Sequence, residues 1–360
     1  MSDILNRLSS LRDVMKQENI DVFLCTDLIN VRYMTGFTGS AGTAIVSPES
    51  NIFITDERYR EQVKSEVQHW ETRIIISGNL FDRVAEIVKE LGGSRIGIEA
   101  DHLPLARYMD LSEKIVHSEF VPTDKLIRKF RQVKSQNEIK SLYKAGAVIG
   151  SVYDRIDEIL KPGVSEKEVA LWIRNTLEKL GAEKVSFPTI VLFGARASLP
   201  HGQPGDTILE PPAMVLMDFG GVVEGYHGDF TRTVFVGDPD QEFLNAYNLV
   251  VEAQRVGVDA VAPGKTGEEV DGAARKIIDA GGYGEYFIHA LGHSLGLEIH
   301  ESPRVAQRSE DVLQPGMIVT IEPGVYKPEW GGIRIEDMVL VTEKGGERLT
   351  KSSRELKIIS

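Results

Sequence analysis

The feature that most restricts the fold of this chain is an internal repeat in its second half. The decapeptide LKPGVSEKEV at 160–169 is echoed by VAPGKTGEEV 101 positions later, and VLMDFG at 215–220 is echoed by VTIEPG 104 positions later. In both copies of the first motif, a Pro-Gly break is followed by Ser or Thr and then, three residues on, by Glu, which is the capping-box signal for a helix start. The sequence therefore predicts two copies of one unit made of helices and a β-hairpin.

Each copy ends in a predicted hairpin that carries acidic residues among apolar neighbours. In the first hairpin, apolar runs around Asp218 and Asp229 flank a Val-Glu-Gly turn, so the two carboxylates should face each other or lie one diagonal apart. In the second hairpin, Glu322 and Glu336 occupy the corresponding positions around a turn-like Pro-Glu-Trp-Gly-Gly segment. Aspartate is depleted in strands and is rarely buried without a partner, so a cation between the facing carboxylates would resolve their repulsion.

Four such carboxylates and one imidazole would form a dinuclear metal site. Four carboxylates neutralise two dications, and Mn²⁺, Co²⁺, Fe²⁺ and Zn²⁺ accept oxygen ligands together with an imidazole. The imidazole should come from a segment in which His289, His293 and His300 lie within 12 residues. His289 and His293, four residues apart, could both bind metal on a helix. Gly292 and Gly296 argue against a regular helix there, so His293 alone is the predicted histidine ligand.

Local patterns predict an α/β domain before the repeat, with no catalytic constellation of its own. The expected helices span 4–17, 57–66, 81–91 and 103–115, and the expected strands span 21–26, 43–46, 51–55 and 95–98. After a basic segment near 123–134, the capping-box pattern at Ser135 predicts a helix that runs to about Leu160, and a second helix is expected from Ser165 to Lys179.

The five predicted ligands, in order along the chain, resemble those of the methionine aminopeptidase, aminopeptidase P and prolidase superfamily of metallopeptidases. Their contexts are MDFG at Asp218, GDFTRT at Asp229, GHSLGLEIHE at His293, TIEPG at Glu322 and GIRIED at Glu336. The resemblance implies a mixed α/β (α+β) chain whose residues 129–360 form a catalytic domain with the pseudo-symmetric "pita-bread" fold. In residues 1–128, MTGFTGSAGTAIV and ITDERY resemble the creatinase-like accessory domain of Xaa-Pro aminopeptidases and Xaa-Pro dipeptidases, which methionine aminopeptidases lack.

The resemblance implies a metal-dependent Xaa-Pro aminopeptidase, which removes the N-terminal residue of short peptides with proline in second position. Water activated by two divalent ions, Mn²⁺ first and Co²⁺, Zn²⁺ or Fe²⁺ otherwise, would attack the peptide bond. Three histidines are expected at the substrate: His201 and His289 beside it, and His300 at its carbonyl group. Glu322 is expected to bind metal and also to move a proton, and Arg334 is expected to orient a carboxylate that binds metal. One departure from the expected pattern is Ser294, which stands where glycine, alanine or a larger apolar residue is expected.

Alternatives remain at this point. A Xaa-Pro dipeptidase (prolidase) would carry the same motifs, and none of them separates the two activities. A metal-free creatinase-like hydrolase and a non-catalytic peptide-binding module share the fold, but both lose metal ligands, and all five are present here. Taken one at a time, each acid or histidine could also be an ordinary turn, surface or core residue. Their order and their equivalence in the repeat are what favour a site.

Charge and cysteine content limit the partners and the compartment. With 54 acidic against 41 basic residues, the net charge of −13 argues against nucleic-acid or anionic-membrane binding. The sequence has no run of 18 apolar residues and no signal-peptide pattern, so neither a transmembrane helix nor a signal peptide is expected. The single cysteine, Cys25, cannot form an internal disulfide, which indicates a reducing, cytoplasmic location. The family resemblance also implies a homodimer.

Overall fold

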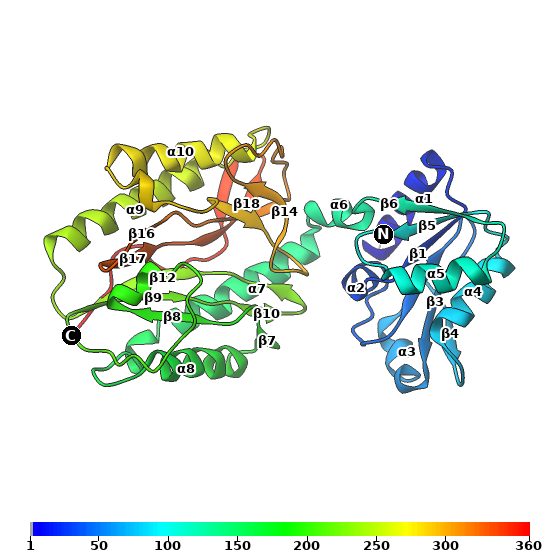
Figure 1. The fold of residues 1–360 in the computed structure, drawn as a ribbon, viewed down its shortest axis with the longest axis horizontal. Coiled ribbons are helices and arrows are strands. Elements are labelled where there is room, and N and C mark those ends of the chain that lie inside the picture. Colours follow the sequence, from blue (N-terminus) through cyan, green and yellow to red (C-terminus); the bar gives the residue numbers. More distant parts are fainter. Residues whose placement is uncertain (1–2) are drawn as a thin grey trace. The chain divides into compact units, whose positions relative to one another are not determined.

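The structure is a computed structural model that describes residues 3–360. The chain separates into two compact units, Met1–Arg131 and Gln132–Ser360, and helix α6 (Leu126–Gln132) spans the boundary (Figure 1). The predicted boundary at 128/129 falls within this helix. Among the described residues, no helix combines the length and the apolar character needed to cross a membrane.

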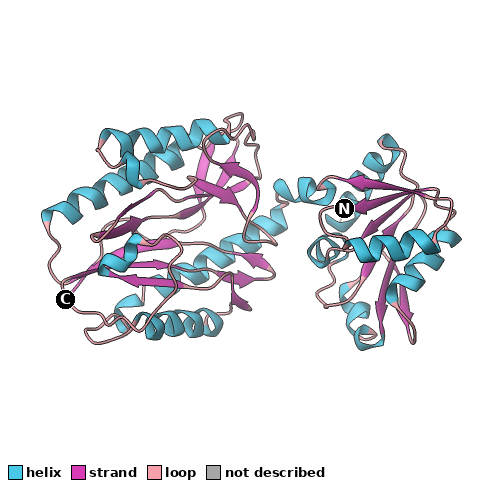
Figure 2. Ribbon diagram, viewed as in Figure 1, coloured by secondary structure: helices cyan, strands magenta, loops and turns pink. Residues whose placement is uncertain are grey.

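The first unit contains a mixed six-stranded sheet with strand order β4-β3-β2-β1-β5-β6. Its middle strand β1 is buried at every position because helices and loops cover both faces, so it reads as a continuous apolar run. Helices α4 and α5 pack against the strands through one cluster of buried aliphatic side chains (Figure 2). The elements are α1 (Asp3–Gln17), β1 (Val22–Cys25), α2 (Leu28–Thr35), β2 (Thr43–Val46), β3 (Asn51–Asp56), α3 (Gln62–Glu66), β4 (Glu71–Ile75), α4 (Leu80–Glu90), β5 (Arg95–Glu99), α5 (Leu105–Lys114) and β6 (Glu119–Thr123).

The local predictions for this unit agree with the structure except at one helix. The predicted helix 57–66 is two separate pieces, a 3₁₀ turn Glu57–Tyr59 and the short α3. The first piece starts where the Asp56 side chain accepts a hydrogen bond from the Arg58 backbone N–H, as an N-cap does. The sequence patterns did not reveal α2, β4 or β6.

The second unit consists of two similar halves, each with a pair of helices packed on a sheet. Helices α7 and α8 pack with the sheet β20-β12-β9-β8, and α9 and α10 pack with the sheet β14-β13-β15-β18-β19. In Figure 1 one helix pair lies on each side of the strands. The elements are α7 (Gln136–Tyr153), α8 (Glu166–Lys179), β7 (Lys184–Val185), β8 (Ile190–Phe193), β9 (Ala213–Asp218), β10 (Gly221–Val223), β11 (Tyr226–His227), β12 (Thr231–Val236), α9 (Gln241–Ala260), α10 (Gly267–Ala280), β13 (Gly292–Ser294), β14 (Glu301–Val305), β15 (Ile318–Ile321), β16 (Gly324–Lys327), β17 (Gly331–Arg334), β18 (Asp337–Thr342), β19 (Gly345–Arg348) and β20 (Ile358–Ile359).

The predicted repeat is confirmed by local geometry. Ser165 begins α8 and Thr266 begins α10, and both form complete capping boxes with the Glu three residues later. Each capping residue also makes an isolated antiparallel bridge, Ser165 to Ile208 and Thr266 to Val312. Ser165 and Thr266 are equivalent residues of the two copies, and the two bridges show that they make equivalent contacts. This equivalence is expected from the pseudo-symmetry of the pita-bread fold.

The helix that was predicted to run from Ser135 to about Leu160 ends earlier. It starts with the predicted capping box but stops at Tyr153, and the chain continues through a 3₁₀ turn, Ile156–Glu158. The side chains of Ile156 and Leu160 are both fully buried in the cluster between α7, α8 and the first sheet. The tighter turn therefore lets this segment bend back onto the core.

The alternation of side chains along β9 determines which way its terminal acid points. Val215 and Met217 face the α7–α8 cluster, whereas Met214 and Leu216 face the larger cluster that α9 and α10 share with the second sheet. Asp218 has the parity of Met214 and Leu216, since side chains alternate with a period of two. Its carboxylate therefore points toward the space between the two halves.

Candidate metal centre

The first hairpin places its two aspartates one diagonal apart. Strand β9 pairs with β12 so that Asp218 lies opposite Thr231, and Asp229 lies two residues before Thr231, the first residue of β12. Between them, β10 and β11 close on Glu224 and Gly225, which both have positive φ, 53° and 83°. This two-residue turn sets the register of the hairpin. Of the two predicted arrangements, the diagonal one is present.

The second hairpin places its two glutamates opposite each other. Strands β15 and β18 pair Ile321 with Asp337, and β16 and β17 pair Gly324 with Arg334. The same register sets Glu322, just after β15, opposite Glu336, just before β18. The two halves therefore supply equivalent pairs of acids, although the repeat is not exact in register.

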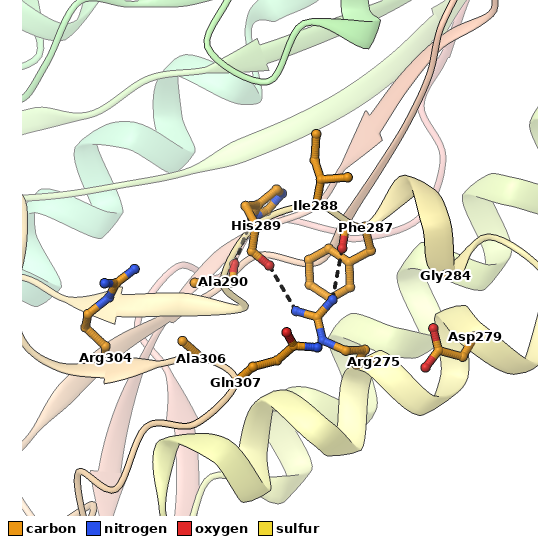
Figure 3. A pocket seen from close by; sticks show the side chains of 10 residues that line it. All are labelled: Arg275, Asp279, Gly284, Phe287, Ile288, His289, Ala290, Arg304, Ala306 and Gln307. Atoms are coloured by element: carbon orange, nitrogen blue, oxygen red, sulfur yellow. Dashed lines mark hydrogen bonds between the residues drawn. The ribbon is translucent and has the colours of Figure 1, made fainter.

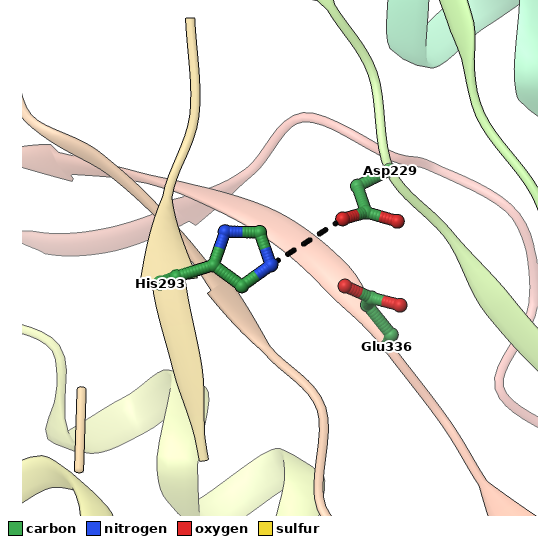
Figure 4. Close-up of side chains that lie close together, drawn as sticks. All are labelled: Asp229, His293 and Glu336. Carbon is green, nitrogen blue, oxygen red and sulfur yellow. Dashed lines mark ion pairs between the residues drawn. The ribbon is translucent and has the colours of Figure 1, made fainter. Parts of the chain in front are cut away.

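His293 projects from β13 toward these acids. Its Nδ1 lies 3.0 Å from the Ser294 carbonyl oxygen, so Nδ1 carries the proton that makes this hydrogen bond. Its Nε2 lies 3.5 Å from Oδ2 of Asp229 and 3.6 Å from Oε1 of Glu322. One ligand atom each of Asp229, His293 and Glu336 lies within 4.8 Å of the others. Figure 4 shows these three side chains pointing toward one another. The tautomer leaves the Nε2 lone pair directed at the carboxylates.

Neighbouring side chains satisfy only part of the carboxylate oxygens. The Arg334 Nη2 donates to Oδ2 of Asp218 at 2.6 Å, and the Thr231 hydroxyl donates to Oε2 of Glu336 at 2.6 Å. The other oxygens, Oδ1 of Asp218 and Oε1 of Glu336, are buried and have no hydrogen-bond partner. Buried polar atoms are normally paired, so two unpaired carboxylate oxygens in one cluster call for a ligand.

The carboxylates are strongly perturbed by burial and by one another. Burial, together with the charges of Asp218 and Glu322, raises the pKa of Asp229 well above its usual value. Burial, with Asp229 and Glu322 nearby, likewise raises the pKa of Glu336 well above its usual value. Burial raises the pKa of Glu322 to about 8, although Arg334 opposes the shift. Burial also raises the pKa of Asp218. Without a bound cation, the protein therefore supplies too little positive charge to balance the four carboxylates of this cluster.

A pair of divalent cations fits this donor set. Four carboxylates and one neutral imidazole match the oxygen and nitrogen ligands of Mn²⁺, Co²⁺, Fe²⁺ or Zn²⁺. Burial lowers the pKa of His293 to about 4, so its imidazole is neutral and able to bind metal at neutral pH. The residues that would hold the ions are Asp218, Asp229, His293, Glu322 and Glu336.

The other predicted histidines lie around this cluster. The ring of His300 stacks edge-on against His293, with centroids 4.4 Å apart. His289 Nε2 lies 3.0 Å from the Tyr326 hydroxyl, and burial lowers the pKa of His289 to about 4. His201 is exposed in the loop between β8 and β9 and lies close enough to Asp218, His289 and His300 to influence the pKa values of these three residues. The structure therefore gathers all three histidines near the carboxylates.

A cavity of about 640 Å³ lies beside His289 (Figure 3). Its floor includes Arg275, which forms an ion pair with Asp271 and donates to the carbonyl oxygens of Phe287 and His289. The cavity lining also includes Arg304, which is exposed. Burial is the main cause of the lowered pKa of His293 and of His300, and the nearby charge of Arg304 lowers both pKa values further. The cavity therefore borders His289 and two arginines, Arg275 and Arg304, and its lining includes none of the five predicted metal ligands.

Two contributors to the site were missed by sequence reasoning. The Tyr326 hydroxyl accepts a hydrogen bond from Nη1 of Arg334 at 2.5 Å and also contacts His289. The Thr320 hydroxyl accepts from the His293 backbone N–H at 3.0 Å and donates to Glu322 at 3.1 Å. No local sequence pattern signals either residue, because the partner of Tyr326 lies 37 positions away and the partner of Thr320 lies 27 positions away.

Comparison with known proteins identifies the two parts of the chain. Residues 140–343 match the model of metallopeptidase family M24, and residues 7–133 match the creatinase/prolidase N-terminal domain. A peptidase of Bacillus subtilis, the uncharacterized peptidase YqhT, is 43% identical over 353 residues, which cover 98% of this chain and 100% of the relative.

Solved structures give the same assignment. A Xaa-Pro dipeptidase from Bacillus anthracis is 42% identical and superposes with a TM-score of 0.96 over 99% of this chain and 100% of that one. A X-Pro aminopeptidase from Thermotoga maritima is 33% identical, with a TM-score of 0.93 over 98% of this chain and 100% of that one. Full-length similarity of this kind, together with the paired acidic hairpins and His293, shows that the chain belongs to metallopeptidase family M24.

Proposed function

We propose that this protein is a Xaa-Pro aminopeptidase that holds two divalent metal ions per chain and removes the N-terminal residue of short peptides whose second residue is proline. The observation that carries the proposal is the buried cluster of four carboxylates around His293, in which two carboxylate oxygens have no partner in the protein. Membership of family M24 supports a metal-dependent peptidase. The names of similar structures, an X-Pro aminopeptidase among them, support the substrate class.

The metal ions would act as Lewis acids and lower the pKa of a water molecule at the site. Around them, we assign Glu322 the transfer of a proton to the departing proline nitrogen, because its carboxylate lies at the centre of the cluster, with Oε1 3.6 Å from Nε2 of His293. His300, whose ring packs against His293, donates a hydrogen bond to the carbonyl oxygen as negative charge develops there. Arg334 holds the Asp218 carboxylate at 2.6 Å and so fixes its orientation.

His289 and Tyr326 form the next layer of this arrangement. The Tyr326 hydroxyl links Arg334 to His289, so the arginine that holds Asp218 is itself fixed from behind. Because burial lowers the pKa of His289 to about 4, its ring is neutral at working pH and does not compete with the metal ions for the carboxylates. His201 is exposed in its loop, which suits contact with bound peptide.

A Xaa-Pro dipeptidase is the second candidate, favoured by the name of the Bacillus anthracis structure. A dipeptide ends in a carboxylate directly after proline, and an exposed cation near the cluster would recognise it. Arg304 lines the cavity beside His289 and is exposed. If dipeptides are the substrate, Arg304→Met should raise KM for Xaa-Pro by tenfold or more and leave KM for Xaa-Pro-Xaa tripeptides nearly unchanged, as expected for losing a charge-assisted hydrogen bond of roughly 1.5–3 kcal/mol.

The deciding experiment compares Xaa-Pro with Xaa-Pro-Xaa and longer peptides on one reconstituted sample whose metal content is measured. The proposal predicts efficient cleavage of tripeptides and longer peptides. Preference for the dipeptide would make the second candidate correct. Failure to cleave any of these peptides with metal bound would reject both.

Three finer points belong to the same proposal. We propose Mn²⁺ as the native ion, with Co²⁺, Zn²⁺ or Fe²⁺ as substitutes, since all accept this mixed oxygen and nitrogen ligand set. A cytoplasmic location is supported by Cys25, which is a buried free thiol. We propose that the accessory domain, residues 1–128, limits the peptide length that reaches residues 129–360 and contributes to a homodimer.

A further inference from the structure

One buried lysine next to the metal centre has no role in the proposed reaction. Lys134 lies between α6 and α7, and its side chain is 1% exposed. Its Nζ donates to Oγ of Ser294 at 3.1 Å and to Oε2 of Glu301 at 3.2 Å. The lysine backbone is fixed as well, since its N–H donates to the Gly316 carbonyl oxygen. Burying a charged side chain is unfavourable unless it is paired, so this contact is a specific feature of the fold.

The two side-chain partners of Lys134 stand beside two of the histidines of the site. Ser294 directly follows His293, and Glu301 directly follows His300. The Ser294 carbonyl oxygen accepts the Nδ1–H of His293, which fixes the tautomer and turns Nε2 toward Asp229 and Glu322. A single lysine therefore contacts the residue that orients the histidine ligand.

The lysine also acts at an irregularity in the strand ladder. Strands β13 and β14 pair Ser294 with Glu301, but the neighbouring His293 pairs with Arg304, so the register shifts between His293 and Ser294. At such a shift the regular ladder no longer fixes the strand direction. Lys134 bridges the cross-strand pair Ser294 and Glu301 at this point.

The Glu301 carboxylate is enclosed on its other side. Its Oε1 accepts the Glu298 backbone N–H at 3.1 Å, and a Cβ at Gly296 would lie 2.9 Å from both of its oxygens. The turn between the two histidines is therefore wrapped around this carboxylate. Loss of its counter-charge would loosen the turn and, with it, the packing of His300 on His293.

We propose that Lys134, Ser294 and Glu301 form a positioning network that holds His293 and His300 in place for metal and substrate. The inference rests on the proposed function, since it assigns the network to the same metal centre. It also gives a physical reason for Ser294, which departs from the expected glycine or apolar residue: its hydroxyl accepts a hydrogen bond from the buried lysine. Outer partners of metal ligands typically change metal affinity or activity by about 10–100-fold when they are removed.

The test titrates Co²⁺ alone into metal-free protein by calorimetry, with the visible absorption of bound Co²⁺ recorded in parallel. The main variant is the double substitution Lys134→Met/Glu301→Gln, which removes both charges and leaves neither unpaired. Ser294→Ala, which keeps the ion pair, is the second variant. Tyr247→Phe is the matched control, because it removes a hydrogen bond of a buried side chain to the Arg354 carbonyl oxygen elsewhere in the same unit.

We expect the double variant to bind Co²⁺ about 10–100-fold more weakly with an altered spectrum, and to lower kcat on a Xaa-Pro-Xaa peptide more than it raises KM. Ser294→Ala should change the spectrum and weaken Co²⁺ binding by a smaller factor. If the double variant does not fold, the result for Ser294→Ala tests the positioning network by itself. Tyr247→Phe should lower Tm and leave Co²⁺ affinity unchanged. Wild-type affinity and spectrum in both network variants would overturn the inference. Absence of Co²⁺ binding by the wild-type protein would instead overturn the proposed function.

Discussion

Replacing Glu322 by glutamine should stabilise the metal-free protein while removing its activity. Burial raises the pKa of Glu322 from 4.5 to about 8, so the folded state holds a proton that the unfolded state has released above pH 4.5. For a raised pKa, stability is complete below the unfolded value and is lost as pH rises through the folded value. The metal-free protein should therefore lose stability between pH 4.5 and 8. Glutamine carries no charge and does not suffer this loss.

The size of the effect follows from the pKa. One pKa unit is worth about 1.4 kcal/mol, so ionising Glu322 destabilises the metal-free fold by at most about 4 kcal/mol at pH 8 and by less than about 0.5 kcal/mol at pH 4.5. A domain of the size of residues 132–360 shifts its Tm by roughly 2–4 °C per kcal/mol. Metal-free Glu322→Gln should therefore melt roughly 10 °C above the wild type at pH 8 and close to it at pH 4.5.

The assay is thermal unfolding by circular dichroism in the presence of chelator at both pH values. Exposed Glu310 provides the control, since Glu310→Gln changes the same functional group outside the cluster. Adding Mn²⁺ should reverse the order at pH 8, because only the wild type gains the binding free energy of its full ligand set. An equal Tm at pH 8, or a gain that is the same at both pH values, would refute the claim that the site stores uncompensated carboxylate charge.

Further expected outcomes concern single groups and the accessory domain. Asp229→Ala should abolish peptidase activity with little loss of fold, because it removes a shared anionic ligand whose burial is unfavourable without metal; a variant that stays active would exclude Asp229 as a ligand. His300→Ala should lower kcat by about 100-fold with metal content intact, as for loss of one oxyanion donor; loss of metal would place His300 among the ligands. Residues 129–360 expressed alone, if they unfold cooperatively, should lose discrimination between di-, tri- and pentapeptides and associate differently in sedimentation. Unchanged length preference and unchanged association would show that the accessory domain has another role.

The sequence was sufficient for the parts of the site that follow local rules. Spacing around two turns predicted both acidic hairpins, and the capping boxes at Ser165 and Thr266 predicted the repeat, since turn and cap chemistry act over a few residues. The choice between facing and diagonal aspartates required the register of β9 and β12, which depends on the turn at Glu224 and Gly225. The argument from Gly292 and Gly296 against a helix around His293 holds, because this segment contains strand β13.

The remaining features depend on contacts between distant residues. Lys134 meets Ser294 across 160 positions, and Arg334 meets Asp218 across 116. Tyr326 reaches His289 only because β16 turns back beside the segment that carries the histidine. Such pairings arise only when segments that are distant in the sequence pack together, and no local pattern encodes them. The early end of α7 at Tyr153 has the same origin, since burial of Ile156 and Leu160 outweighs helix continuation.

The metal content of the protein tests most directly whether the carboxylate cluster is a dinuclear metal site. Metal-free protein should be reconstituted with Mn²⁺, freed of excess ion, and measured by mass spectrometry, together with its rate of cleavage of a Xaa-Pro-Xaa peptide. We expect two ions per chain and activity that rises as they are taken up. Protein that retains no divalent ion, or that cleaves the peptide equally well in its metal-free form, would contradict this expectation.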